Sequence, residues 1–248
     1  MSASPEPGGQ VQQLQPVSVR VVTATSLFDG HDAAINVVRR VLQSQGAEVI
    51  HLGHDRSALE IVDAAIEEDA QAIAVSCYQG GHNEFFHYLI DLLRERGAEH
   101  VRVYGGGGGT ILPDEIRALM GYGVARIFSP EDGRALGLVP MVGSIVHECA
   151  ERARQAAPVR IEPLIALLAP DAPQAIAQAI SWFELRSEQH SERHSERADG
   201  GELERARAAL KLRSARQTPV LGITGTGGAG KSSVVDELVR RFRRDGPE

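Results

Sequence analysis

Between residues 17 and 154, five short apolar runs alternate with five longer segments of helical periodicity, and this pattern constrains the fold more than any other feature of the chain. The apolar runs, rich in Val, Ile and Ala, predict strands at residues 17–25, 47–52, 72–76, 101–105 and 125–128. The intervening segments predict helices at residues 32–45, 57–69, 84–96, 113–121 and 133–154. A regular exchange of strand and helix is typical of a parallel sheet with helices on both faces.

The expected fold is therefore α/β, with a five-stranded parallel sheet of the flavodoxin-like (Rossmann-like) type. Crossovers of this type are right-handed, and we expect the flavodoxin-like strand order 2-1-3-4-5. Aromatic residues make up only 4% of the chain, so small and branched aliphatic residues must form the core, which suits a sheet buried on both faces. Ligands of such sheets bind beyond the carboxyl ends of the strands, near the point where the strand order reverses. We therefore expect the functional residues just after strands one, three and four.

Charge and hydropathy argue against several classes of protein. The formal net charge is -7 and no cluster of Lys and Arg stands out, which disfavours a duplex nucleic acid as partner. No stretch approaches the roughly 18 apolar residues of a membrane span, and the first sixteen residues lack the basic and apolar regions of a signal peptide. The two cysteines, Cys77 and Cys149, give neither a disulfide framework nor the spacing of zinc ligands. We expect a cytoplasmic protein that contacts neither membrane nor nucleic acid.

The composition changes along the chain and predicts four regions. These are a disordered lead-in at 1–16, a ligand-binding domain at 17–155, a helical and charged linker at 156–216, and the start of a second domain at 217–248. Within the linker, residues 161–185 are apolar and helical, residues 184–202 are polar and low in complexity, and residues 202–214 resume as a charged helix. His190 and His194 stand four residues apart, a spacing that could hold a metal. No third ligand is fixed beside them, so we interpret the polar run as a solvated linker.

Asp29 and His31 lie between the first expected strand and the first expected helix, and two interpretations of them are open. In one, an aspartate of this loop, Asp29 or Asp32, caps the helix and the histidine is incidental. In the other, His31 is a metal ligand and an aspartate accepts a hydrogen bond from its second ring nitrogen. Such a bond fixes the tautomer and raises the basicity of the ligand.

Small residues follow the third and fourth expected strands. Ser76 ends the third strand, and five consecutive glycines occupy residues 105–109 after the fourth. A glycine run is costly in backbone entropy, and it makes sense where a ligand approaches the backbone closely; a flexible hinge is the alternative. A dinucleotide fingerprint would follow the first strand instead, which disfavours a Rossmann-type dinucleotide. The loops together predict a channel floored by glycine with a histidine at its mouth, suited to a long ligand that carries a metal at one end.

A nucleotide-binding motif lies near the end of the chain. The segment GTGGAGKS at residues 225–232 matches the P-loop pattern, follows an expected strand at 218–224 and precedes an expected helix. The residues expected to bind nucleotide are Gly225, Gly227, Gly228, Ala229, Gly230, Lys231 and Ser232. Lys231 would reach the β- and γ-phosphates, and Ser232 would ligate Mg²⁺. Since the sequence stops one helix later, at Glu248, we expect a truncated nucleotide-binding domain that binds nucleotide weakly.

Residues 17–150 resemble the cobalamin-binding domains of methylmalonyl-CoA mutase, isobutyryl-CoA mutase and methionine synthase. The family pattern is Asp-x-His-x-x-Gly, then Ser-x-Leu, then Gly-Gly, and this sequence departs from it at Ala34 and Tyr78. The resemblance implies that His31 is the lower axial ligand of cobalt and that Asp29 is its hydrogen-bond partner. It also implies that the displaced nucleotide tail of the cofactor contacts Ser76 and packs on the backbone of the glycines Gly105, Gly106 and Gly107.

The order of cobalamin domain, linker helices and P-loop resembles the fused isobutyryl-CoA mutases. This implies an adenosylcobalamin-dependent isomerase that converts isobutyryl-CoA to n-butyryl-CoA, with a GTPase chaperone domain that uses Mg²⁺ and GTP. The acyl-CoA would bind to a barrel beyond Glu248, the full protein would be a homodimer, and this portion alone would not be catalytic. The alternatives are a methylmalonyl-CoA mutase subunit, a methyl carrier, or a non-catalytic cobalamin-binding sensor or carrier module. The sequence chooses neither the acyl group nor GTP over ATP.

Overall fold

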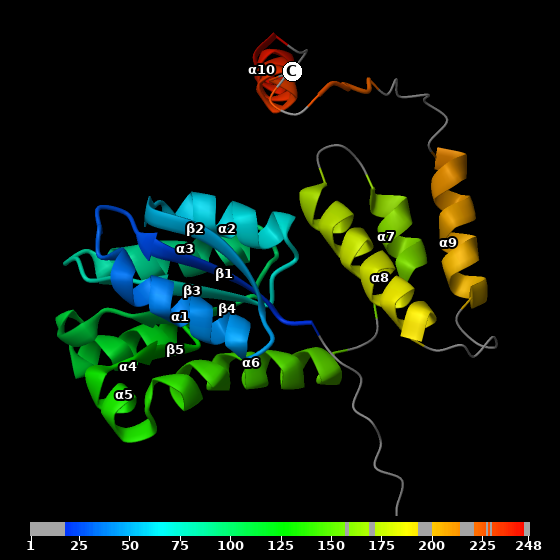
Figure 1. The fold of residues 1–248 in the computed structure, drawn as a ribbon. Coiled ribbons are helices and arrows are strands. Elements are labelled where there is room, and N and C mark those ends of the chain that lie inside the picture. Colours follow the sequence, from blue (N-terminus) through cyan, green and yellow to red (C-terminus); the bar gives the residue numbers. More distant parts are fainter. Residues whose placement is uncertain are drawn as a thin grey trace, which may run out of the picture. The chain divides into compact units, whose positions relative to one another are not determined.

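A five-stranded parallel sheet organises the first part of the chain (Figure 1). Its strands are β1 (Arg20–Ser26), β2 (Glu48–Arg56), β3 (Ala72–Ser76), β4 (Arg102–Gly106) and β5 (Arg126–Phe128). They lie in the order β2-β1-β3-β4-β5, and every neighbouring pair is parallel. This confirms the predicted flavodoxin-like order, in which the direction of winding reverses between β1 and β3.

The computed structural model describes residues 18–156, 159–168, 172–192, 200–213, 221–226, 228 and 230–245. By its internal contacts the chain divides into two units, residues 1–206 and 207–248. None of the described helices is both long and apolar enough to cross a membrane.

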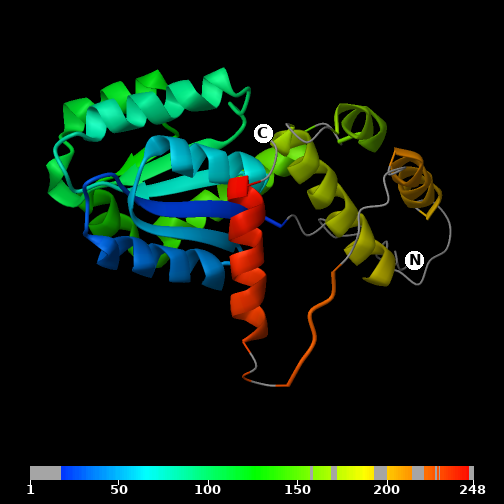
Figure 2. The same cartoon turned by 90° about the horizontal axis from the view of Figure 1, so that it is seen from above.

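Helices cover both faces of the sheet, and each face has its own apolar core. The helices are α1 (Asp32–Ser44), α2 (Ala58–Glu67), α3 (His82–Glu95), α4 (Pro113–Tyr122), α5 (Pro130–Leu136) and α6 (Leu138–Gln155). One core joins the sheet to α2, α3 and α4 around Val22, Phe86 and Leu119, and the other joins it to α1 and α6 around Leu42 and Ile145. Figures 1 and 2 show the strands between α1 on one side and α3 on the other. Side chains alternate along each buried strand, so consecutive residues serve opposite cores.

The helix expected at residues 133–154 is in fact two helices. A short helix, α5, begins at Pro130 with a capping box between Ser129 and Asp132, and it ends at Gly137, whose φ is +78°. That left-handed conformation suits glycine and turns the chain into α6. Pro140 is tolerated in the first turn of α6, where its missing N–H would have no helical partner. The prediction was wrong because the helical spacing of the apolar residues continues across this glycine.

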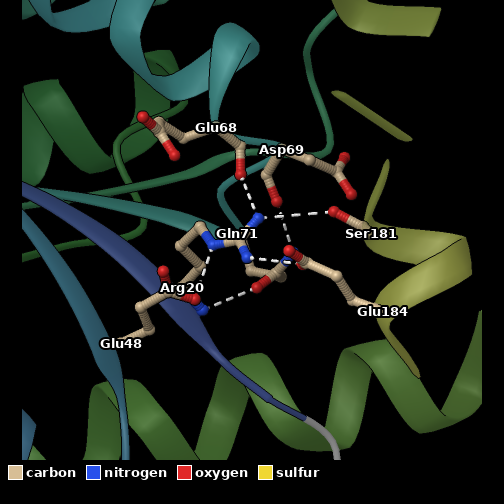
Figure 3. A network of polar contacts seen from close by, with 7 residues as sticks. All are labelled: Arg20, Glu48, Glu68, Asp69, Gln71, Ser181 and Glu184. Atoms are coloured by element: carbon tan, nitrogen blue, oxygen red, sulfur yellow. Dashed lines mark hydrogen bonds and ion pairs between the residues drawn. The ribbon is translucent and has the colours of Figure 1, made fainter. Parts of the chain in front are cut away.

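Beyond α6, the region expected to be a linker contributes helices to the first unit. These are α7 (Ile161–Leu167) and α8 (Pro173–Glu192), whereas α9 (Gly200–Arg213) spans the boundary between the two units at residues 206 and 207. Helix α8 packs against α2 and buries Trp182. Figure 3 shows how the Arg20 guanidinium donates to the Ser181 hydroxyl and the Glu184 carboxylate of α8, both at 3.3 Å. His190 lies within α8, whereas His194 lies outside the described residues.

The second unit contains α10 (Lys231–Asp245), which is the helix expected after the P-loop sequence and begins within the last two residues of that sequence. The strand expected at 218–224 is not found in its described part, because residues 221–224 are not in a strand. A strand is defined by its hydrogen-bonded ladder, and residues 221–226 pair with none of the described strands. An apolar run alone therefore did not suffice to predict this element.

Candidate functional site

The loop between β1 and α1 holds Asp29 and His31 in direct contact. Asp29 Oδ1 accepts a hydrogen bond from the backbone N–H of His31 at 2.9 Å and lies 2.7 Å from His31 Nδ1. Asp29 Oδ2 accepts a short hydrogen bond from the backbone N–H of Tyr78, in the loop after β3. His31 occupies the N-cap position of α1 without a side-chain cap bond. The carboxylate of Asp29 thus orients the histidine and does not cap the helix.

The contact with Asp29 determines which ring nitrogen His31 presents to the solvent. The carboxyl group of Asp29 is buried, and burial alone would raise its pKa. The N–H groups of Tyr78 and His31, together with the imidazole, outweigh that effect and lower the pKa below its usual range. An ionised carboxylate only accepts hydrogen bonds, so Nδ1 is the ring nitrogen that donates to Asp29, and in the neutral ring the lone pair is on Nε2. The His31 side chain is 76% exposed and its Nδ1 is engaged by Asp29, so Nε2 is the ring nitrogen that is open to a metal.

Beside this loop, a cavity of about 390 Å³ opens between the sheet and the helices α1, α5 and α6. Its walls are mainly apolar, and they include Ala34, Val38, Tyr104, Met141, Val142 and Ile145. The sequence analysis did not identify the wall formed by α6. A stripe at positions 138, 141, 142 and 145 has helical spacing, but that signal alone does not separate a core face from a ligand face.

Ser76 stands at the carboxyl end of β3 and lines this cavity. Its hydroxyl makes no hydrogen bond to any part of the chain that the structure describes. The other hydroxyls of the lining include two that are already engaged, since Ser129 caps α5 and Tyr104 lies 3.9 Å from Cys149 Sγ. Among the described residues, the Ser76 hydroxyl is thus an unengaged polar group in a mainly apolar wall.

The backbone of Gly105, Gly106 and Gly107 also lines the cavity, but the three glycines are needed for different reasons. A Cβ at Gly105 would lie 2.5 Å from Phe86 Cζ, on the opposite face of the sheet. A Cβ at Gly107 would lie 1.9 Å from the carbonyl oxygen of Cys77. A Cβ at Gly106 would meet nothing closer than a backbone oxygen at 3.4 Å. Packing explains the glycines at 105 and 107, and only Gly106 leaves room on the cavity side.

The two departures from the expected pattern fit the structure. Tyr78 contributes its backbone N–H to Asp29, which any residue except proline could do, and its ring lies 5.6 Å from that of His31. Ala34 lies in the first turn of α1 and lines the cavity. Alanine is a strong helix former, so the methyl group suits this position.

The P-loop residues of the second unit are partly described. Lys231 begins α10, and its Nζ donates to the carbonyl oxygen of Thr226 at 2.7 Å. Ser232 follows in the first turn of the helix. Gly228 and Gly230 both have a φ of +76°, as a tight glycine loop requires, whereas Gly227 and Ala229 lie outside the described residues.

Residues 19–136 match the family model of the B12 binding domain. The fused isobutyryl-CoA mutase of Geobacillus kaustophilus is 56% identical over 230 residues, which cover 93% of this chain and 20% of that protein. The 2-hydroxyisobutanoyl-CoA mutase small subunit of Aquincola tertiaricarbonis is 39% identical over 97 residues, which cover 39% of this chain and 69% of that subunit. A solved cobalamin-binding protein from Desulfitobacterium hafniense DCB-2 has a TM-score of 0.44 and 22% identity, over 53% of this chain and 59% of that chain. The chain therefore spans about a fifth of the length of the fused mutase that it matches.

Proposed function

This chain belongs to the B12-binding domain family, and we propose that it holds a cobalamin with His31 as the lower axial ligand of the cobalt. The observation that carries this proposal is the contact between Asp29 and His31, which engages Nδ1 and leaves Nε2 of an exposed side chain available at the carboxyl edge of the sheet. The family resemblance alone would leave the orientation of the imidazole undetermined.

The residues around His31 fit the rest of such a cofactor. The cavity beside the histidine loop is apolar, as a planar aromatic tail requires, and it contains the free hydroxyl of Ser76 for one polar atom of that tail. Gly106 leaves space for close approach to the backbone of β4. These three features lie along one edge of the sheet, where ligands of this fold bind.

We further propose that the chain serves an adenosylcobalamin-dependent acyl-CoA mutase, with isobutyryl-CoA and n-butyryl-CoA as substrate and product. When bound, adenosylcobalamin supplies the organic radical that rearrangement of a carbon skeleton requires. The part played by this chain is to hold and tune the metal. His31 donates its Nε2 lone pair, and the ionised Asp29 increases the basicity of the ring. We expect this chain alone to bind the cofactor without catalysing the rearrangement.

For residues 225–232 we propose binding of GTP with Mg²⁺ in a chaperone domain of a homodimeric full-length protein. The start of α10 at Lys231 supports this proposal, because a helix N-terminus preceded by a glycine loop is suited to phosphate. Lys231 would exchange its bond to the Thr226 carbonyl for phosphate oxygens, and Ser232 would ligate Mg²⁺.

The test of cobalt ligation is the EPR spectrum of the protein bound to cobalamin in the paramagnetic Co(II) state. Protein with ¹⁵N-labelled histidine should change the nitrogen splitting, and His31→Ala should abolish that dependence on the label. His54→Ala, at another exposed histidine on β2, is the matched control and should behave as wild type. A splitting that does not respond to the label would show that the cofactor keeps its own base, and His31 would then be an ordinary loop residue.

A further inference from the structure

Two threonines of β1 point to the same face of the sheet but differ in their hydrogen bonding. Thr23 Oγ1 lies 2.9 Å from His51 Nδ1 of β2 and is paired. Thr25 is fully buried, and its Oγ1 has no hydrogen-bond partner among the described residues. A buried hydroxyl without a partner destabilises a folded protein, so such a group in a well-packed strand calls for a reason.

The position of Thr25 in the sheet suggests that reason. In the register of β1 and β3, Thr25 is opposite Ser76, and neighbouring strands lie about 4.8 Å apart. Thr23 is opposite Ala74, which lines the cavity as Ser76 does. The alternation of side chains therefore places Thr25 and Ser76 side by side on the cavity face. Ser76 lines the cavity and Thr25 does not, so the route from Thr25 to a ligand that the register offers runs through Ser76.

We propose that Thr25 is a positioning residue for the nucleotide tail of the cofactor, acting through Ser76. After a change of side-chain rotamer, the Thr25 hydroxyl donates to Ser76 Oγ, and the Ser76 hydroxyl donates to an acceptor nitrogen of the heteroaromatic base in the cavity. Both hydroxyls are then paired, and each has one acceptor. This inference rests on the proposed cobalamin binding, and it adds a residue and a direction of donation.

We call these two successive hydrogen bonds, from Thr25 to Ser76 and from Ser76 to the base, the relay. It predicts that removal of the Thr25 hydroxyl has opposite effects on the stability of the cofactor-free protein and on its affinity for cobalamin. Thr25→Val keeps the shape of the side chain and removes only the unpaired hydroxyl. The cofactor-free protein should become no less stable, because a desolvated polar group without a partner is lost. Affinity for cobalamin should fall by roughly three- to tenfold, the effect of one net hydrogen bond. A purely structural role would change stability first.

The experiment compares cobalamin with cobinamide, the corrinoid that lacks the nucleotide tail. Dissociation constants are measured by absorption titration, and stability by urea denaturation without cofactor. Thr25→Val should weaken cobalamin binding and leave cobinamide binding unchanged, and Thr25→Ser should restore wild-type affinity for cobalamin. Thr23→Val is the matched control, and it should reduce the stability of the cofactor-free protein because it breaks the bond to His51. In a double-mutant cycle with Ser76→Ala, the two effects on cobalamin affinity should be non-additive.

Three results would overturn the relay. These are an equal loss of affinity for both corrinoids, no loss for cobalamin, and a loss of stability in Thr25→Val as large as that in Thr23→Val. In each of them wild-type protein still binds cobalamin, so the proposed function survives. If wild-type protein binds neither corrinoid, the proposed cobalamin binding is contradicted, and the relay that rests on it is contradicted as well.

Discussion

The two ends of the same sheet differ in how fully their polar groups are hydrogen-bonded. At the amino-terminal end, Arg20 donates from Nε to Glu48 at 2.7 Å and from Nη1 to the carbonyl oxygen of Glu68 at 2.6 Å, besides its bonds to α8 (Figure 3). Gln71 accepts from the backbone N–H of Arg20 and donates to the carbonyl oxygen of Asp69, each at 2.7 Å. Backbone and side-chain groups of β1, of the turn after α2 and of α8 are thereby bonded to one another.

At the carboxyl-terminal end, groups remain without protein partners or in costly conformations. The hydroxyls of Thr25 and Ser76 have no hydrogen-bond partner among the described residues, and the His31 side chain is exposed. Phe28 is 85% exposed and has a φ of +64°, a left-handed conformation that bulky side chains rarely adopt. The polar groups described at the opposite end are paired, so the difference supports the proposal that the carboxyl end is arranged for a ligand and the amino end for stability.

The largest expected effect on stability is at Gly107, a position at the carboxyl end of the sheet where the packing leaves no room for a side chain. In Gly107→Ala the new Cβ would lie 1.9 Å from the carbonyl oxygen of Cys77, whose N–H is bonded to Gly106 O at 2.7 Å. Relief would require movement of the ladder between β3 and β4, so we expect a loss of about 3 kcal/mol in the free energy of unfolding. Gly109→Ala, which meets nothing within 4 Å, is the control. Equal urea midpoints for the two variants would show that the loop is free to shift.

At the amino end, Arg20→Gln should destabilise the protein by about 2 kcal/mol, because the Glu68 carbonyl, Glu48 and Glu184 lose a charged donor. The side chain of Arg20 is only 17% exposed, whereas that of Arg117, paired with Asp114, is 71% exposed. Arg117→Gln should therefore change the free energy of unfolding by less than about 0.5 kcal/mol. Affinity for cobalamin should not change in either variant, and a clear loss of affinity in Arg20→Gln would contradict the division between the two ends.

How much of this was predictable from sequence depends on the range of the interactions. The strand at 72–76 was predicted to the residue, because a buried apolar run is a local signal. Asp29 and His31 were identified because both lie in one short loop, and the structure brings them within hydrogen-bonding distance. The α6 wall of the cavity and the pairing of Thr25 with Ser76 depend on packing and strand register between distant segments. The packing of α8 through Arg20 joins residues more than 160 positions apart, and no local sequence pattern predicts this contact.

A smaller effect should come from the strained residue of the histidine loop. The backbone N–H of Phe28 donates to Asp55 Oδ1 at 2.7 Å, and this bond holds the residue in its left-handed conformation. Phe28→Gly removes the steric cost at some expense of backbone entropy, so we expect a gain of about 0.5–1 kcal/mol. Asp69, at the amino end, also has a positive φ, but its side chain interacts with Ser181. Asp69→Gly should therefore gain less than Phe28→Gly in thermal denaturation, and the reverse order would contradict the comparison.

The smallest effect is on the pH dependence of stability, where two aspartates at opposite ends should act with opposite signs. The N–H of Ser129, followed by Arg126, lowers the pKa of Asp132, next to the carboxyl end of β5. Its contribution to stability is present above the unfolded pKa of about 3.9 and is lost as the pH falls through the lower folded value. Burial raises the pKa of Asp69, so its ionisation destabilises the fold as the pH rises through the folded value.

Urea midpoints measured between pH 3 and pH 7 separate the two contributions. Asp132→Asn should lower stability at pH 7, on the order of 0.5 kcal/mol, and reduce the loss in acid. Asp69→Asn should be more stable than wild type at pH 7 by a larger margin than at pH 3, because the amide is buried without the cost of ionisation. Both substitutions are isosteric, so their difference isolates the charge. If both variants shifted stability in the same direction at pH 7, burial would not be the dominant influence on Asp69, and the amino end would hold its carboxylate by attraction to Arg20 instead.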